Sequence, residues 1–348
     1  MRPGPTQSSP SRGEGLICFL TPLVSLLFFV MAASAPASAA DKVKLSYVIP
    51  SVEYADMFLA IDKGYFAEEG IEVALEQAGG GVAVPALIAG NIDFTGSGSV
   101  AISAILKGAK LKVLFVTDAH PAMQIWAQSA IKDFADLKAK QIGIISRGDT
   151  TEIAIRYYLA KHNLSADYVA FTPLGPGAAR FAAITSGTFP AALVNASEVE
   201  EMRATGKLGN LHLLVDLRRE LAMAYNALAT SDALIASNPD LVQRMVRAIL
   251  KSVRHVKASR ADTIATLLSR GHSNEKAISL EYDNLIDSIT MTGTMPKADQ
   301  DFDIALRAGM LDLPKDKVSA ASVFDFRFAD KANAALDAAK WQPRLSVP

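Results

Sequence analysis

The chain has 348 residues, 35 of them Lys or Arg and 36 Asp or Glu, which gives a formal net charge of −1 at pH 7. A balance this close to neutral gives no indication of nucleic-acid binding or of attraction to an anionic membrane surface. The one cysteine, Cys18, lies near the N-terminus, so disulfides, thiolate metal sites and a cysteine nucleophile are excluded from the rest of the chain. The length is ample for two lobes of ordinary domain size.

The N-terminal segment has the three parts of a secretory signal peptide. Arg2 and Arg12 make a basic start, Leu16 to Met31 is almost wholly apolar, and Ala37-Ser38-Ala39 gives a small-residue cleavage pattern. The alternative is a retained membrane anchor, which needs ~20 apolar residues to span a bilayer, and the apolar run here is shorter. We therefore expect residues 1–39 to be a cleaved signal peptide and the mature chain to be exported.

The first elements of the mature chain form a strand-helix-strand unit. Residues 44–49 are predicted to be a strand, and the loop at 50–54 leads into a helix that ends near Gly64. Gly70 ends the short acidic turn that follows. Apolar and polar residues then alternate from 71 to 76 with the two-residue period of a strand. This order is one βαβ unit.

Helical and strand patterns continue to alternate along the first half of the chain. We predict a flexible turn at 78–81, a helix at 82–89, a short strand at 91–95, a polar loop at 96–99, a helix at 100–107 capped by Ser99, and a strand at 111–116. Strands that alternate with helices indicate an open, mainly parallel α/β sheet.

The pattern restarts beyond residue 120. We predict strands at 141–145 and 164–171, a polar loop at 146–151, helices at 152–162 and 178–185, strands at 211–215 and 225–230, and helices from 239 almost to 339. An internal echo accompanies the restart. Residues 86–94 align with residues 183–191, and both read as a helix end, a glycine, a short strand and then a polar loop. The echo suggests two lobes that are built on one plan.

Three segments carry a family resemblance. Residues 60–73 read A-x-x-K-G-Y-F-A-E-E-G-I-E-V, and residues 231–246 contain the motif N-P-D-x-V. Residues 135–144 are similar to x-D-L-K-G-K-x-I-G-V, with Ala139 in place of the usual second glycine. On these motifs the chain resembles the solute-binding proteins of ATP-binding-cassette importers. The branch is the one that handles nitrate, alkanesulfonates, taurine, aromatic acids and thiamine precursors, and the resemblance covers most of the mature chain.

The resemblance implies a fold and a function. The fold is the two-lobe, type II-like periplasmic-binding-protein fold, in which each lobe is a mainly parallel sheet flanked by helices. The first lobe is expected to comprise residues 41–127 and 225–348, and the second lobe residues 128–224, with a ligand cleft between them. The implied function is that of a periplasmic monomer that captures a small organic ligand by hinge closure and delivers it to a membrane permease, without a cofactor or metal.

No catalytic or metal-binding constellation appears in the sequence, since its five histidines show no paired ligand spacing. The loops after the predicted strands are more informative, because ligands collect beyond the carboxyl ends of strands in open α/β sheets. The loops at 50–54, 96–99 and 146–151 have a suitable polar composition. Ser, Thr and Gly also make ordinary caps and turns, so composition alone leaves a purely structural role open.

Matching loops line the cleft in the family. Position by position, the resemblance implicates as ligand-binding residues Ser51, Tyr54, Ser97, Ser99, Arg147, Thr150, Thr151 and Asn195. Arg147 could pair with a carboxylate or sulfonate, so an anionic ligand is expected. Glu53 and Asp149 stand beside the same loops and leave a cationic or amine-bearing ligand open.

Two alternatives from other functional classes remain. Enzymes share the fold, among them thiamine-pyrimidine synthases, whose cysteine-rich motif is absent here, and a small lyase with a single Ser or Asp in the cleft stays open. A periplasmic sensing module would bind the same ligands and hand them to a signalling partner. The expectation from the resemblance is a binding protein without enzymatic activity.

Overall fold

Two five-stranded sheets organise the computed structural model, which describes Met1 and residues 39–271, 274–314 and 318–346. The predicted signal peptide lies almost entirely outside the described residues, and its cleavage stays a prediction. From Ala39 onward the chain forms one compact unit. None of the described helices is long and apolar enough to cross a membrane.

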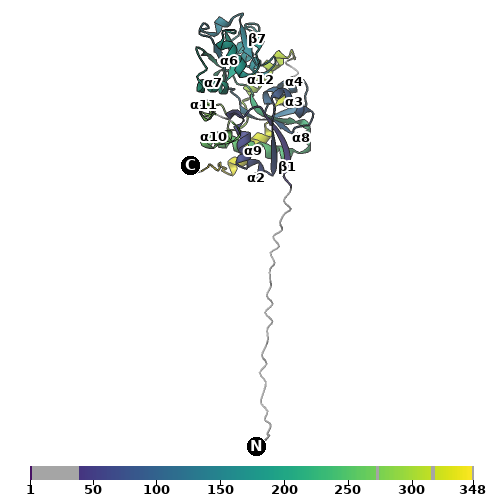
Figure 1. Ribbon diagram of the computed structural model, residues 1–348. Helices are drawn as coiled ribbons and strands as arrows, with labels where there is room; N and C mark the ends of the chain where they lie inside the picture. The colour runs from purple at the N-terminus through teal and green to yellow at the C-terminus, as the bar shows by residue number, and fades with distance from the viewer. Residues whose placement is uncertain (2–38, 272–273, 315–317, 347–348) are drawn as a thin grey trace. The chain divides into compact units, whose positions relative to one another are not determined.

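The first sheet has the strand order β2-β1-β3-β10-β4, and the second sheet has the order β7-β6-β8-β5-β9. The strands of the first sheet are β1 (Asp41–Tyr47), β2 (Ile71–Gln77), β3 (Phe94–Thr95), β4 (Leu111–Asp118) and β10 (Asn226–Ser231). The strands of the second sheet are β5 (Met123–Ala127), β6 (Gln141–Ile144), β7 (Ala170–Pro173), β8 (Ala191–Asn195) and β9 (His212–Asp216). In Figure 1, β1 lies in one half of the folded part of the chain and β7 in the other.

Helices flank both sheets. Those that follow strands of the two sheets are α1 (Ala55–Asp62), α2 (Tyr65–Glu68), α3 (Gly80–Ile88), α4 (Gly98–Leu106), α5 (Thr150–Lys161), α6 (Gly177–Thr185) and α7 (Ala196–Ala204). The C-terminal helices are α8 (Asp232–Ser237), α9 (Pro239–Ala258), α10 (Arg260–Ser269), α11 (Glu275–Leu285), α12 (Lys297–Met310), α13 (Ala320–Val323) and α14 (Arg327–Ala338). Short 3-10 helices are η1 (Val52–Tyr54), η2 (Phe134–Leu137) and η3 (Leu217–Arg219). The predicted mixed α/β class, with helix-flanked sheets, is confirmed.

The two sheets share one pattern of strand directions. In the first sheet β1 pairs in parallel with β2 and β3, whereas β10 runs antiparallel to β3 and β4. In the second sheet β6 pairs in parallel with β7 and β8, whereas β5 runs antiparallel to β8 and β9. The antiparallel strand of each sheet is the one that the chain enters on crossing from the other sheet.

Strand β5 corrects the predicted lobe boundary. Residues 123–127 were assigned to the first lobe, but they pair with β8 and β9 of the second sheet. The chain therefore changes sheets between β4 and β5, in a segment where the sequence offers no break between two apolar strands. We propose a second lobe that runs from Met123 to Asp216, with the rest of the folded chain as the first lobe.

The internal echo of the sequence is present in the structure. Helix α3 starts at Gly80 and α6 at Gly177, 97 residues later, and both helices have nine residues. The same offset relates the pairing of Leu45 with Phe94 in the first sheet to the pairing of Ile142 with Ala191 in the second. The two lobes therefore repeat the same helix and the same strand neighbours.

Three segments differ from their prediction. The strand expected at 164–171 forms only at Ala170–Pro173. The turn expected at 78–81 is shorter, because α3 already begins at Gly80. A Cβ atom at residue 80 would lie 2.6 Å from Cγ2 of Val100, so glycine is needed for the packing of α3 on α4. The N-cap of α4 is Ser97 in place of the predicted Ser99.

Helix α9 fixes the core of the first lobe. It starts with Pro239 in its first turn, and Oδ1 of Asn238 accepts a hydrogen bond from N of Leu241 at 3.1 Å. Its apolar side, which includes Met245 and Ile249, is buried against α1, α2 and α14. Helix α9 thus joins α1, α2 and α14 in one apolar core beside the first sheet.

Candidate functional site

A cavity of about 300 Å³ lies between the two lobes. Six of the eight residues predicted to bind ligand line it, namely Tyr54, Ser97, Ser99, Thr150, Thr151 and Asn195. The first three follow β1 and β3 of the first sheet, and the other three follow β6 or end β8 of the second sheet. The carboxyl ends of the parallel strands of both sheets therefore meet at one cavity, as the fold rule for open α/β sheets predicts.

A hydrogen-bonded chain crosses the cavity wall from one lobe to the other. Oγ1 of Thr150 donates to Oγ of Ser99 at 3.3 Å. Arg307 of α12 donates to the same Oγ at 3.0 Å and to the carbonyl oxygen of Ser99 at 2.8 Å. The fully buried guanidinium of Arg307 is paired in turn with Asp303, whose other oxygen accepts from N of Ala224 at 3.2 Å. Ser99 is thus held in place by Arg307 of the first lobe and contacts Thr150 of the second lobe.

Sequence reasoning missed Arg307 and Asp303. They lie about two hundred residues beyond Ser99 in the chain, in a helix whose charged residues look like a solvated face. Their spacing of four residues is the one usable signal, because it fits an ion pair along a helix.

Several buried polar atoms of the site have no hydrogen-bond partner among the described residues. Oγ of Ser97 and Oδ1 of Asn195 belong to residues that line the cavity, whereas Ser51 precedes η1 and Ser197 is the second residue of α7. A buried polar atom without a partner costs about 1–3 kcal/mol. Such atoms are expected where a ligand supplies the missing partner. Ser51 itself does not line the cavity but is buried at the start of η1, the turn that carries Tyr54.

Arg147 is the second predicted site residue, after Ser51, that does not line the cavity. Its Nη2 donates to the carbonyl oxygen of Phe171 at 2.7 Å, and its Nη1 lies 3.5 Å from Oε1 of Glu152. The guanidinium also lies over the ring of Phe171. Gly148, at φ +73°, turns the chain here, and its N–H donates to Glu152 at 2.8 Å. Arg147 therefore faces a neighbouring groove beside Lys107.

The cavity wall carries two carboxyl groups, Glu53 and Asp149, and no Lys, Arg or His is among the residues that line it. Asp149 caps α5, because its Oδ1 accepts from N and Oγ1 of Thr151 at 3.1 and 2.6 Å. Burial nevertheless raises the pKa of Asp149. Burial raises the pKa of Glu53 much further, with the charges of Glu281 and Asp118 adding to the effect and a hydrogen bond from Asn226 opposing it.

Three more carboxyl groups are buried behind Glu53. Burial raises the pKa of Asp56 to about 7, of Asp118 to about 7 and of Glu281 to about 8. Each accepts a backbone hydrogen bond inside the protein, from Met57, His120 and Val52 respectively, at 2.7–2.9 Å. These acids come from α1, β4 and α11, and only the fold brings them together.

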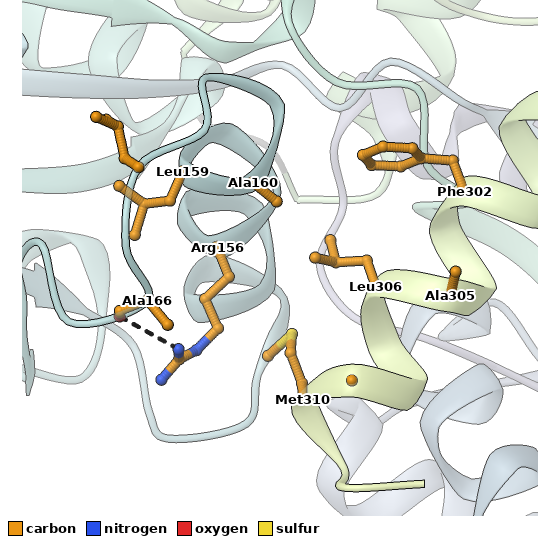
Figure 2. A pocket seen from close by; sticks show the side chains of 10 residues that line it. Arg156, Leu159, Ala160, Ala166, Phe302, Ala305, Leu306 and Met310 are labelled. Atoms are coloured by element: carbon orange, nitrogen blue, oxygen red, sulfur yellow. Dashed lines mark hydrogen bonds between the residues drawn. The ribbon is translucent and has the colours of Figure 1, made fainter. Parts of the chain in front are cut away.

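A second groove, of about 390 Å³, lies between α5 and α12 (Figure 2). Ala160 of α5 lies on the side of α12 that carries Leu306 and Phe302, and the walls of the groove are mainly apolar. Its one charged wall residue, Arg156, already donates to Glu152 at 2.7 Å. We place the site in the smaller cavity because the orphaned polar atoms and the predicted residues converge there.

The described residues offer no group of three or more His, Cys, Asp or Glu side chains that could hold a metal ion. The convergence of hydroxyl, amide and carboxyl groups on a cavity between two lobes fits the binding of a small polar organic molecule.

Comparisons with known proteins place the chain in a family. Residues 51–261 match the model of the family described as NMT1/THI5 like. The riboflavin-binding protein RibY of Chloroflexus aurantiacus is 30% identical over 237 residues, which are 64% of this chain and 61% of that protein. The match thus spans less than two thirds of the relative's length.

Solved structures share the fold. The alkanesulfonate-binding protein SsuA from Xanthomonas axonopodis pv. citri, bound to MOPS, superposes with a TM-score of 0.66 at 22% identity, covering 82% of this chain and 99% of that one. The desulfurization enzyme DszB superposes with a TM-score of 0.60 at 15% identity, covering 85% of this chain and 99% of that one. Binding proteins and at least one enzyme therefore use this fold. On the family model, which matches well over half of the chain, the protein belongs to the NMT1/THI5-like family.

Proposed function

We propose that the chain is the solute-binding component of an ATP-binding-cassette uptake system. It binds one small organic molecule between its lobes outside the cytoplasm and presents the closed form to a membrane permease. The observation that carries the proposal is the cavity lined from both lobes, with unpartnered polar atoms on each side, at Ser97 and at Asn195. A ligand that pairs with both sides favours the closed form, because only that form offers all of its contacts at once.

The charge of the cavity wall argues for a ligand other than the anion expected from the sequence. That expectation rested on Arg147, whose guanidinium is engaged with Phe171 and Glu152 outside the cavity. The wall instead carries Glu53 and Asp149. An anion placed there would face carboxyl groups without a compensating cation. We propose an uncharged or cationic ligand, which agrees better with the riboflavin of the named relative than with a sulfonate.

A ligand screen tests the proposed function. The mature chain is mixed with riboflavin, pyrimidines, amines, sulfonates and carboxylates, and thermal unfolding is recorded. A ligand present at 100 times its Kd adds about 2.7 kcal/mol to the free energy of unfolding, which raises the Tm by several degrees. Ser97→Ala and Asn195→Ala should each weaken the binding of a hit by about tenfold. Ser129→Ala, an exposed change outside the cavity, is the matched control.

If the protein were an enzyme, it would convert the compounds that it binds in the same screen. A fold shared with a desulfurization enzyme makes turnover worth measuring directly. Each hit is incubated with the protein and analysed by mass spectrometry. We expect every hit to be recovered intact. A product formed in proportion to protein concentration and lost in Ser97→Ala would replace binding with catalysis.

A further inference from the structure

The cavity wall combines two carboxyl groups and polar oxygen atoms that lack a partner, and no Lys, Arg or His of the described residues lines it. The carboxyl groups are those of Glu53 and Asp149, whose pKa values are raised, as are those of the two tyrosines in the wall. Oδ1 of Asn195 has no partner and can only accept a hydrogen bond. Ser97, whose residue is 6% exposed, adds a hydroxyl oxygen without a partner. Acceptors without a partner favour a ligand that brings donors, such as N–H groups.

Glu53 differs from the acids buried behind it. Asp56, Asp118 and Glu281 each accept a hydrogen bond from a backbone N–H of the protein and do not line the cavity. Glu53 lines the cavity and is 6% exposed. It is therefore the member of this acidic group that a ligand can reach.

The surroundings of Glu53 hold its position and oppose its charge. Nδ2 of Asn226 in β10 donates to its carbonyl oxygen at 3.3 Å. The charges that face it come from Glu281 of α11, Asp118 of β4 and Glu198 of α7, and the last of these is paired with the buried Arg180 at 2.6 Å. No cation is among the groups that act on it. An added positive charge would relieve this repulsion, and an added negative charge would increase it.

We propose, resting on the function proposed above, that Glu53 is the specificity-determining contact of the cleft and that it binds a basic nitrogen group of the ligand, such as an amine, an amidine or an aminated nitrogen heterocycle. The N–H groups donate to the carboxylate of Glu53, and the remaining donors of the ligand reach Asn195 and Ser97 across the cavity.

Binding of a basic group changes the protonation of Glu53. In the free protein, burial and the neighbouring acids raise the pKa of Glu53 and so shift this carboxyl group toward its protonated form. A basic group that arrives uncharged takes this proton and forms the ion pair. A group that arrives as a cation displaces the proton to solvent. Binding of a cation is therefore accompanied by proton release, and it weakens as the pH falls.

Three probes of one shape test the proposal. Benzamidinium, benzamide and benzoate share a ring and differ in charge. We expect benzamidinium at millimolar concentration to raise the Tm of the mature chain, benzamide to raise it less, and benzoate to leave it unchanged. Calorimetry of benzamidinium in phosphate and in Tris, whose ionisation enthalpies differ, should show a buffer-dependent heat that reports proton release.

Two variants distinguish direct contact of Glu53 with the ligand from the effect of the acids around Glu53. Glu53→Gln should weaken benzamidinium binding by about tenfold or more and abolish the buffer-dependent heat, because the neutral amide cannot form the ion pair. Glu281→Gln removes a neighbouring acid that does not line the cavity, and it should leave benzamidinium binding within a few-fold of the parent.

The comparison of the three probes needs only the parent protein, so it tests the proposal even where a variant does not fold. Benzoate binding as tightly as benzamidinium, no binding of benzamidinium, or unchanged benzamidinium binding in Glu53→Gln would each overturn the assignment. The proposed function would then still stand or fall on the ligand screen and on Ser97→Ala and Asn195→Ala. A screen without any cleft ligand would remove both.

Discussion

The two lobes repeat one plan but present different chemistry to the cavity they share. With the 97-residue offset, Thr150 of the second lobe corresponds to Glu53 of the first. The second lobe offers hydroxyl and amide groups and one carboxyl group, Asp149, which caps α5, while Arg147, Glu152 and Arg156 are paired with one another outside the cavity. The first lobe concentrates buried ionisable groups next to the cavity, namely the acids around Glu53 and the Arg307–Asp303 pair.

This difference indicates which lobe selects the ligand and which lobe closes over it. Buried charges are costly unless they are paired, so they persist where function or a tight network requires them. The first lobe, with its cluster of buried ionisable groups, is suited to select the ligand. The second lobe, whose hydroxyl and amide groups on α5 and β8 line the cavity beside the capping carboxyl group of Asp149, is suited to close over the bound ligand. The predictions below test each side of this comparison.

The largest effect is expected from breaking the buried pair behind Ser99. Arg307→Met leaves Asp303 buried without its partner, which should lower the free energy of unfolding by about 3–5 kcal/mol. The matched control is the double variant Arg307→Met with Asp303→Leu, which removes both charges. Denaturant unfolding of the two proteins should show most of the stability restored in the double variant. Equal destabilisation in both would show that packing, not charge, is decisive at this position.

The next effect concerns pH and is again confined to the first lobe. The pKa values of Asp56, Asp118 and Glu281 are raised to about 7, 7 and 8 in the folded protein, whereas the unfolded chain ionises these groups near pH 4. Between pH 4 and 8 the unfolded chain therefore holds fewer protons than the folded chain, and stability contributed by these groups falls as pH rises through this window.

Unfolding in urea at several pH values measures this loss. We expect the free energy of unfolding to decline from pH 5 to pH 8 and to level off above, after the effect of other groups is referenced to Glu281→Gln. That variant should show a shallower decline, by on the order of 1.4 kcal/mol for each unit of pKa elevation that is removed. Parallel pH profiles of parent and variant would contradict the burial of a titrating Glu281.

A moderate effect is expected at the contact between the lobes. Thr150→Val removes the 3.3 Å hydrogen bond to Ser99 and keeps the side-chain shape. The loss of one such bond is worth about 0.5–1.5 kcal/mol, so ligand affinity should weaken a few-fold, with little change in the stability of either lobe. Titration calorimetry with the ligand found in the screen checks this. Affinity that rises in the variant would mean that the bond competes with the ligand.

The smallest effect is expected at Arg147. Its side chain is 57% exposed and its contacts lie outside the cavity. Arg147→Ala should therefore change ligand affinity less than twofold, and stability by no more than about 0.5 kcal/mol. A loss of binding tenfold or greater would return this residue to the site and restore the expectation of an anionic ligand.

Particular residues show how far the sequence could lead. The alternation of strands and helices predicts the α/β class, and the loops after predicted strands contain Ser97, Ser99, Thr150 and Thr151, all of which line the cavity. The α/β class is confirmed and the loop positions are found next to the cavity because strand ends and helix starts are encoded by residues close together in the chain, whereas ligand binding by these residues stays a prediction. Predicting the class and the loops needed no knowledge of tertiary contacts.

The errors have a different origin. Arg147 is held outside the cavity by the carbonyl oxygen of Phe171, 24 residues away, and Arg307 reaches Ser99 from 208 residues away. Residues 123–127 lie in the predicted first lobe but form β5 of the second sheet, because their partners, β8 and β9, lie far along the chain. No local period or composition reports such pairings, and the same holds for the acids that surround Glu53.

The most direct test of the account is a distance across the cleft. The chain has a single cysteine, in the predicted signal peptide, so Val82→Cys and Ala179→Cys in the mature chain accept two spin labels selectively. These exposed positions are separated by the 97-residue repeat and sit on α3 and α6, one on each lobe. The account predicts that saturating ligand shortens and narrows the distance distribution. An unchanged distribution, with ligand bound as judged by thermal unfolding, would contradict binding by closure of the two lobes.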